Sequence, residues 1–157
     1  MKYVYDDGGR EAAGFKGKAG DCVARAVAIA SGKPYAEVYD ALAAGMGSQR
    51  KATKGRSARN GVSTSRKWFK DYMASLGFKW VPTMQIGSGC KVHLHDGELP
   101  MGRLVVAVSR HYTAVINGVV RDTYNPQREI VELRGGPDGV AIPIATRRRC
   151  VYGYWHA

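Results

Sequence analysis

Apolar residues recur with two different periods along the chain, and the period changes near Gly77. Before that point they follow helical spacing in three segments, which span residues 22–31, 34–44 and about 63–76. After it, short stretches rich in Val, Ile and aromatic residues alternate with the two-residue period of strands. Helices followed by strands predict an α+β fold, in which the N-terminal helices pack on a mostly antiparallel β-sheet.

The first helical segment is alanine-rich and apolar on almost every side, so we expect a buried helix at the centre of the fold. Asp21 is placed to cap its N-terminus, and Gly32 is placed to end it. A second helix follows the break at Lys33 and Pro34. Ser63 or Ser65 is placed to cap the third.

Seven short segments have the composition of strands: residues 2–5, 78–81, 91–94, 103–109, 111–116, 119–123 and 150–155. Residues 45–62 are rich in Gly, Ser, Lys and Arg, which predicts a basic, mobile loop. Residues 127–149 form an insertion before the last strand, and its turn signals from 135 onward predict a hairpin-like excursion. The length of 157 residues fits one domain over residues 1–157.

The chain has 24 Lys and Arg against 13 Asp and Glu, a formal charge of +11 that predicts attraction to polyanions such as nucleic acid or an acidic protein. Much of this charge lies in residues 50–70, which are either a phosphate-binding patch or a solvated loop. In the second case the loop leads into a helix whose Trp68 and Phe69 face the core. We favour the loop because no nucleic-acid-binding motif occurs elsewhere. The candidate polyanion-binding residues are Arg50, Lys51, Lys54, Arg56, Arg59, Arg66, Arg147, Arg148 and Arg149.

No apolar run approaches the ~20 residues of a membrane span, and the N-terminal segment lacks the core of a signal peptide. We therefore expect no membrane association and a cytoplasmic location. The cysteines Cys22, Cys90 and Cys150 are odd in number and widely spaced, which argues against a disulfide framework and favours a reducing compartment. Cys150 lies in an apolar strand and is expected in the core.

Cys22 is the cysteine whose position favours chemistry. It follows Gly20 and Asp21 at the first position of the predicted helix, where free backbone N–H groups and the positive end of the helix dipole favour a thiolate. The same N–H groups could hold an oxyanion next to the sulfur. The alternative is that Cys22 is a small buried apolar residue.

His111 lies at the start of a predicted hairpin whose turn is the pair Asn117 and Gly118. That turn pairs Thr113 with Asp122, so His111 and Asp122 become diagonal neighbours on one face, roughly 7–8 Å apart at the backbone. An imidazole held by a carboxylate through one nitrogen can accept a thiol proton with the other. The hairpin therefore predicts a base and the group that orients it.

Asn125 is the rival orienting residue. In the same register it falls opposite Arg110 on the other face, unless the strand bends before Pro126. We therefore prefer Asp122.

A zinc site built on Cys90, His93 and His95 is the remaining metal candidate. No fourth ligand at a typical spacing completes it, so we expect no metal and no other cofactor.

Gly20-Asp21-Cys22 at the head of a buried helix, His111 at a strand start and Asp122 about ten residues later resemble the papain-like cysteine peptidase superfamily, including its bacteriocin-leader-processing and NlpC/P60-like branches. The chain also resembles a set of small proteins encoded by tailed phages and prophages. That second resemblance lies in residues 20–22, 32–35, 76–84, 87–94, 98–100, 109–115 and 149–155.

The resemblance implies a papain-like fold in which Cys22 is the nucleophile, His111 the general base and Asp122 the orienting residue. The implied substrate is a protein or peptide with a peptide or isopeptide bond, and the implied location is the bacterial host during infection, or the virion. Papain-like enzymes place a glutamine about six residues before the cysteine, and here that position is Lys16. Lys16 and Asp21 are therefore the further candidates for oxyanion binding or orientation.

A second function remains open at this point. A catalytically weak papain-like scaffold could serve as a virion or anti-defence protein that binds an anionic partner.

Overall fold

A computed structural model describes residues 1–48 and 56–157, and within them the chain forms three helices and eight strands. Within those residues no helix is both long enough and apolar enough to cross a membrane. The elements in chain order are β1 (Lys2–Tyr5), α1 (Cys22–Ser31), α2 (Tyr35–Ser48), α3 (Lys67–Ser75), β2 (Lys79–Pro82), β3 (Arg103–Val108), β4 (His111–Ile116), β5 (Val119–Asp122), β6 (Glu129–Gly135), β7 (Ala141–Arg148) and β8 (Val151–His156).

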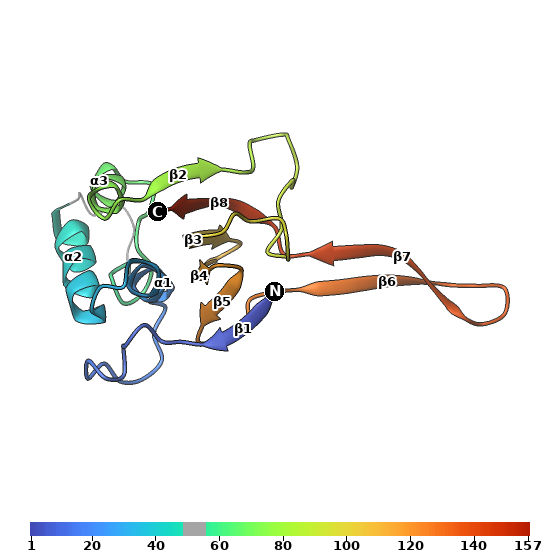
Figure 1. The fold of residues 1–157 in the computed structure, drawn as a ribbon, viewed down its shortest axis with the longest axis horizontal. Coiled ribbons are helices and arrows are strands. Elements are labelled where there is room, and N and C mark those ends of the chain that lie inside the picture. Colours follow the sequence, from blue (N-terminus) through green and yellow to red (C-terminus); the bar gives the residue numbers. More distant parts are fainter. Residues whose placement is uncertain (49–55) are drawn as a thin grey trace.

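Six of the strands form one mixed sheet in the order β1-β5-β4-β3-β8-β2. The β1–β5 pair is parallel and the other four pairs are antiparallel. The three helices lie together on one side of this sheet (Figure 1), and α1 packs directly against β3, β4 and β5. The predicted α+β class is confirmed, and the parallel β1 makes the sheet mixed.

Strand β3 is buried on both faces, which places it at the centre of the fold. Val105 packs with the helices, whereas Leu104 and Val106 pack with Leu94 on the opposite face. This alternation follows from the two-residue period of a strand. The sheet is therefore covered by a helical layer on one face and by the segment around Leu94 on the other.

Helix α1 is the buried central helix that the sequence predicts. Seven of its ten residues are buried, and Gly32 ends it in the left-handed conformation with φ of 71°. The N–H of Gly32 donates to the carbonyl of Ala28 over 2.9 Å, which satisfies one of the last carbonyls of the helix. Cys22 is thereby fixed at the N-terminus of a helix that cannot shift without disturbing the core.

Two helix boundaries differ from the expectation. Helix α2 continues to Ser48, so Gly45 belongs to the helix and not to the expected loop, and it packs so closely under the ring of Trp68 that a Cβ there would clash with the ring. Helix α3 begins at Lys67 with Arg66 in the cap position, so Ser63 and Ser65 do not cap it.

The expected strand over residues 91–94 is absent from the described structure. Its place is taken by an irregular segment that pairs with the start of β8 at one bridge, between His93 and Cys150.

Strands β6 and β7 form a separate two-stranded sheet that projects away from the rest of the molecule (Figure 1). The pairing runs from Glu129 with Arg148 to Gly135 with Ala141, so the hairpin begins earlier than the turn signals from residue 135 predict. It lies within the predicted insertion over residues 127–149. Its exposed apolar side chains are Ile130, Val131, Leu133, Val140, Ile142 and Ile144.

Cys90 and Cys150 form a disulfide with a Cα–Cα distance of 5.9 Å. The expectation that the cysteines stay unpaired is therefore wrong for these two, and the description of Cys150 as an apolar core residue is wrong as well. The two cysteines are 60 residues apart in sequence, and the β-bridge between His93 and Cys150 brings their segments together. Cys22 is the free cysteine.

We predict that replacing both Cys90 and Cys150 by serine lowers the free energy of unfolding by up to about 4 kcal/mol, because the disulfide closes a long loop in the unfolded chain. Urea unfolding of the variant and of the wild type measures the difference. In denatured, unreduced wild-type protein a thiol assay should count one thiol, from Cys22. A count of three would show that the disulfide is not formed.

Candidate active site

The β4–β5 hairpin brings His111 and Asp122 together as the sequence predicts. Asn117 and Gly118 form its turn with positive φ of 48° and 76°, and Ile116 pairs with Val119. In this register the Nε2 of His111 lies 2.6 Å from Oδ2 of Asp122. The predicted diagonal contact is confirmed.

Asp122 is held in one orientation. The backbone N–H of Thr123 donates to its Oδ1 over 2.7 Å, which leaves Oδ2 for the histidine. Asp122 is 3 % exposed and His111 is 7 % exposed, so water does not compete for this hydrogen bond. The carboxylate therefore fixes both the position of the imidazole ring and which of its nitrogens faces outward.

Cys22 lies against the other side of the imidazole. It lines the same cavity as His111, and the His111 ring and the Tyr112 backbone lie near enough to the sulfur to lower the pKa of the thiol. Because Nε2 of His111 is engaged by Asp122, the nitrogen that remains for the sulfur is Nδ1. The three residues thus form a continuous relay from the carboxylate through the imidazole to the thiol.

The electrostatics of this relay favour an ion pair. Burial acts to raise the pKa of the Cys22 thiol, but the hydrogen bond and charge of His111, the Tyr112 backbone and the charge of Arg25 together lower it below its ordinary value. Burial acts to lower the pKa of His111, and its hydrogen bonds to Asp122 and Cys22 and their charges raise it to about 9. At neutral pH both shifts favour a thiolate beside an imidazolium.

Tyr124 is a site residue that the sequence analysis missed. Its ring centroid lies 4.9 Å from that of His111, at an interplanar angle of 44°. Tyr124 is half-exposed, so its ring covers the imidazole from the solvent side. The sequence feature that could have indicated this role is an aromatic residue two positions after Asp122.

A cavity of about 480 Å³ opens beside the thiol. Its lining includes Asn60, which a bridge to Gly20 brings next to the start of α1. The side-chain amide of Asn60 has no partner among the described residues, so it is free to donate a hydrogen bond into the cavity. The complete lining is Ala19, Gly20, Cys22, Arg25, Asn60, Gly61, Arg110, His111 and Tyr124.

Asp21 has a different role from the expected one. It precedes α1 in the N-cap position, but its side chain makes no capping hydrogen bond. Its buried carboxylate instead accepts hydrogen bonds from Arg10, Arg25 and the hydroxyl of Tyr35. The first N–H groups of α1 are consequently left uncapped by Asp21 and available to an oxyanion.

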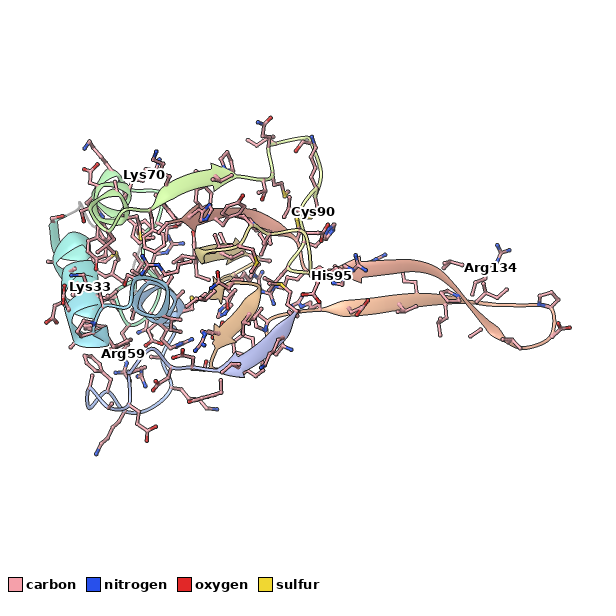
Figure 2. The ribbon with its side chains drawn as sticks, in the orientation of Figure 1. Lys33, Arg59, Lys70, Cys90, His95 and Arg134 are labelled. Carbon is pink, nitrogen blue, oxygen red and sulfur yellow. A yellow bond between two sulfur atoms is a disulfide. The ribbon has the colours of Figure 1, made fainter. Side chains whose placement is uncertain are left out.

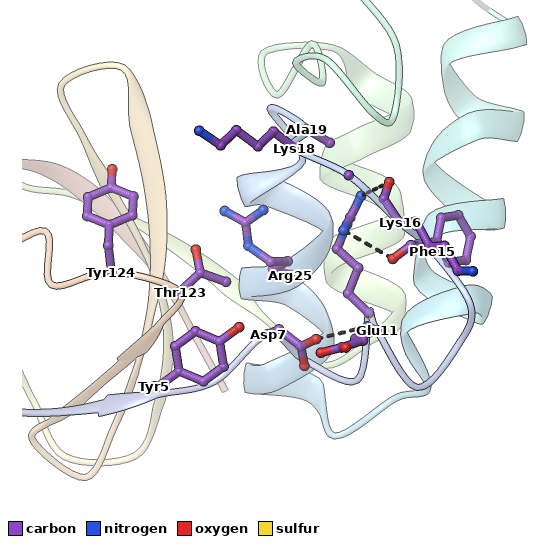
Figure 3. A pocket seen from close by; sticks show the side chains of 12 residues that line it. Tyr5, Asp7, Glu11, Phe15, Lys16, Lys18, Ala19, Arg25, Thr123 and Tyr124 are labelled. Carbon is purple, nitrogen blue, oxygen red and sulfur yellow. Dashed lines mark hydrogen bonds between the residues drawn. The ribbon is translucent and has the colours of Figure 1, made fainter.

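The structure places Lys16 outside the Cys22 cavity. Its backbone carbonyl accepts hydrogen bonds from Arg10 and Arg59, over 3.3 Å and 3.2 Å. Its side chain lines a neighbouring cavity, and Figure 3 shows the ammonium directed away from Arg25. Lys16 does not occupy the position of an oxyanion donor.

Asn125 is placed apart from the imidazole. Its side-chain oxygen accepts hydrogen bonds from the backbone and the side chain of Gln127, and the residue lines a different cavity, near Met1 and His95. The geometry therefore supports Asp122, and not Asn125, as the residue that orients His111.

The basic candidates that the structure describes are spread over separate parts of the molecule. Arg50, Lys51 and Lys54 lie outside the described residues. Arg59 lies near the helical end of the molecule and Arg134 lies far along the projecting hairpin (Figure 2), and the candidates Arg147 and Arg148 belong to that hairpin. Arg56 and Arg66 lie in the segment that leads to α3.

Three of these arginines are engaged within the chain, and one of them is Arg59, which donates to the Lys16 carbonyl. Arg147 pairs with Glu132 across the hairpin. Arg149 is buried and donates to the carbonyls of Ser109 and Pro126, over 2.6 Å and 3.4 Å. It ties together the loops at the ends of β3 and β5, so its assignment to a polyanion-binding surface is wrong.

No cluster of three metal-binding side chains occurs within residues 1–48 and 56–157. Of the zinc candidates, Cys90 is in the disulfide and the Nδ1 of His93 lies 3.2 Å from Glu98.

Comparisons with protein-family models, with curated proteins and with solved structures find no match for this chain. The geometry of the cleft is therefore the basis on which its function is inferred.

We predict that Cys22 reacts with iodoacetamide below neutral pH, because His111 stabilises the thiolate there. In His111→Ala the stabilising charge is lost while burial remains, so the pH at which alkylation reaches half its maximal rate should shift upward. Peptide mass spectrometry of samples quenched across pH 5–10 measures the shift. His95→Ala serves as the matched histidine control and should behave as wild type. An unchanged profile in His111→Ala would contradict the ion pair.

Proposed function

We propose that this protein is a cysteine hydrolase of the papain-like superfamily that cleaves a peptide or isopeptide bond. The observation that carries the proposal is the relay in which Asp122 holds Nε2 of His111 and the thiol of Cys22 meets the same ring. A buried carboxylate, an imidazole and a thiol in this order are the groups that activate a cysteine nucleophile.

In the first half of the proposed reaction, the Cys22 thiolate attacks the carbonyl carbon of the substrate and forms a carbon–sulfur bond. In this mechanism the N–H groups at the start of α1 and the amide of Asn60, which lines the same cavity, stabilise the oxyanion that develops. His111 then gives its proton to the leaving nitrogen, the carbon–nitrogen bond breaks, and the amine departs. The acyl group remains on Cys22 as a thioester, and His111 is left neutral.

In the second half, water attacks the thioester carbon while neutral His111 accepts a proton from it. The carbon–sulfur bond breaks, the carboxylic acid product leaves, and the thiolate and imidazolium are restored. Asp122 stabilises the imidazolium whenever it forms and keeps the ring in place between the two halves.

Two further features support the papain-like interpretation. The nucleophile begins a buried helix that packs on the sheet, and the base begins a strand of that sheet. The order Cys22, His111, Asp122 along the chain agrees with the resemblance found in the sequence.

The alternative function, a non-enzymatic protein that binds an anionic partner, has less support. It requires a continuous basic face, whereas the described candidates are divided between the helical end and the projecting hairpin, and Arg149 is buried.

We predict that Cys22→Ala abolishes hydrolysis of a pool of internally quenched random peptides while leaving the far-UV circular dichroism and Tm close to those of wild type. Asp122→Asn should lower the rate by about a hundredfold or more, because an amide does not stabilise the imidazolium. Asn125→Ala is the matched control, since the Asn125 side chain is bound to Gln127 and lines a cavity away from the ring, and it should retain wild-type activity.

Either of two results would contradict this account. Wild-type turnover in Cys22→Ala would exclude the nucleophile. A larger loss in Asn125→Ala than in Asp122→Asn would exclude the assigned orienting residue.

A further inference from the structure

The cavity beside Cys22 adjoins a larger one. A second cavity of about 820 Å³ lies between the loop that follows β1 and the segment after β5 (Figure 3). Ala19, Arg25 and Tyr124 line both cavities, so the two meet at these residues. A substrate bound across the thiol can therefore extend from Cys22 into the second cavity past Arg25.

Arg25 lies where the cavities meet and retains hydrogen-bonding capacity. It is 8 % exposed and is three residues after Cys22, so the two side chains project from the same face of α1. Its Nη1 donates to Asp21, whereas Nη2 lies 4.0 Å from Asp122, beyond hydrogen-bond distance. Nη2 makes this long ion pair but no hydrogen bond with a described residue, so it keeps hydrogen-bonding capacity for a ligand at the junction.

Lys18 supplies a second cation on the rim of the same space. Its side chain is exposed, and its ammonium has no hydrogen bond or ion pair with any described residue. Figure 3 shows the Lys18 ammonium and the Arg25 guanidinium directed toward the side of the cavity on which Tyr124 lies.

Two acidic residues, Asp7 and Glu11, line the second cavity, and the Asp7 side chain is engaged by the backbone of its own loop. The Asp7 carboxylate accepts hydrogen bonds from the backbone N–H groups of Gly9 and Glu11, both over 2.9 Å. Burial acts to raise the pKa of Asp7, and these backbone hydrogen bonds lower it below its ordinary value. Asp7 therefore stays anionic with both oxygens bound within its own loop, and it makes no ion pair with Lys18 among the described residues.

The buried charges around the thiol balance one another, so none of these groups is left over to pair with Lys18. Three cationic groups face three anionic ones in the resting ion pair: Arg10, Arg25 and His111 against Asp21, Asp122 and Cys22. No acidic residue lines the Cys22 cavity among the described residues, whereas Arg110 lines it as a further cation.

The backbone of Arg110 is unusual. It lies in the two-residue turn between β3 and β4 with φ of 57°, a left-handed conformation that disfavours a side chain of this size. Such strain is found where a side chain is needed at a functional site. The opening next to His111 is thus positively charged on the Arg110 side as well as on the Lys18 side.

We infer that the substrate carries a carboxylate close to the scissile bond, and that Arg25 and Lys18 bind it where the two cavities meet. The inference rests on the proposed hydrolase function and adds the substrate class to it. The carboxylate belongs to an Asp or Glu side chain, or to the free C-terminus of the peptide. A carboxylate at this junction lies near enough to Cys22 to belong to a residue adjacent to the bond that is cleaved.

The test begins with a peptide library digested from a bacterial proteome and incubated with the wild-type protein. Mass spectrometry of the products gives the residues around each cleaved bond. We expect Asp, Glu or a free C-terminus within two residues of the cleaved bond in most products. The best-cleaved peptide is then synthesised with its acidic residue changed to the amide, and separately with its C-terminus amidated, to distinguish the two sources of the carboxylate.

In wild type the acidic peptide should be cleaved with a kcat/KM about tenfold higher than its amide counterpart. Lys18→Gln should remove most of that preference, chiefly through KM. Lys79→Gln is the matched control, because it removes the same charge from an exposed position on β2, and it should keep the preference.

The possible results separate this inference from the proposed function. Cleavage without any preference for a carboxylate, or a preference that Lys18→Gln leaves intact, overturns the carboxylate site while the hydrolase stands. A wild-type protein that cleaves no peptide in the library, with Cys22 shown to be reduced, overturns both.

Discussion

Two buried carboxylates organise the end of the molecule that holds the cleft. Asp21 binds Arg10 from the N-terminal loop, Arg25 from α1 and the hydroxyl of Tyr35 from α2, and Asp122 binds His111. Each buried cation requires its carboxylate, since a charge left unpaired away from water costs several kcal/mol. The loop, α1 and the β4–β5 hairpin are therefore joined through charge pairs, including the one between Arg25 and Asp122, and α2 is joined through the Tyr35 hydroxyl.

The parts of the site that could be predicted depend on local rules. The Asn117-Gly118 turn determines the register of its hairpin, and that register determines which acidic residue meets His111. In the same way, Gly32 and the alanine-rich run define α1, and a helix start defines the environment of Cys22. These inferences need no knowledge of how distant segments pack, which is why the structure agrees with them.

The features that the sequence did not indicate all depend on long-range packing. The Cys90–Cys150 disulfide joins segments 60 residues apart, and the burial of Arg149 results from the loops at Ser109 and Pro126 closing over it. Asn60 reaches the cleft through its bridge to Gly20, and an arginine-rich sequence around it suggested a solvent-exposed loop. Charge and spacing alone cannot distinguish an arginine that binds a partner from one that holds two loops together.

The central claim is that Cys22 and His111 exist as a thiolate–imidazolium pair held by Asp122. The most direct measurement is an NMR titration of the His111 ring nitrogens in the wild type and in Cys22→Ser. The account predicts an imidazolium at pH 7 in the wild type, with a pKa of about 9, and a lower pKa in Cys22→Ser because the thiolate is gone. A neutral His111 at pH 7, or a pKa that does not respond to Cys22→Ser, would contradict it.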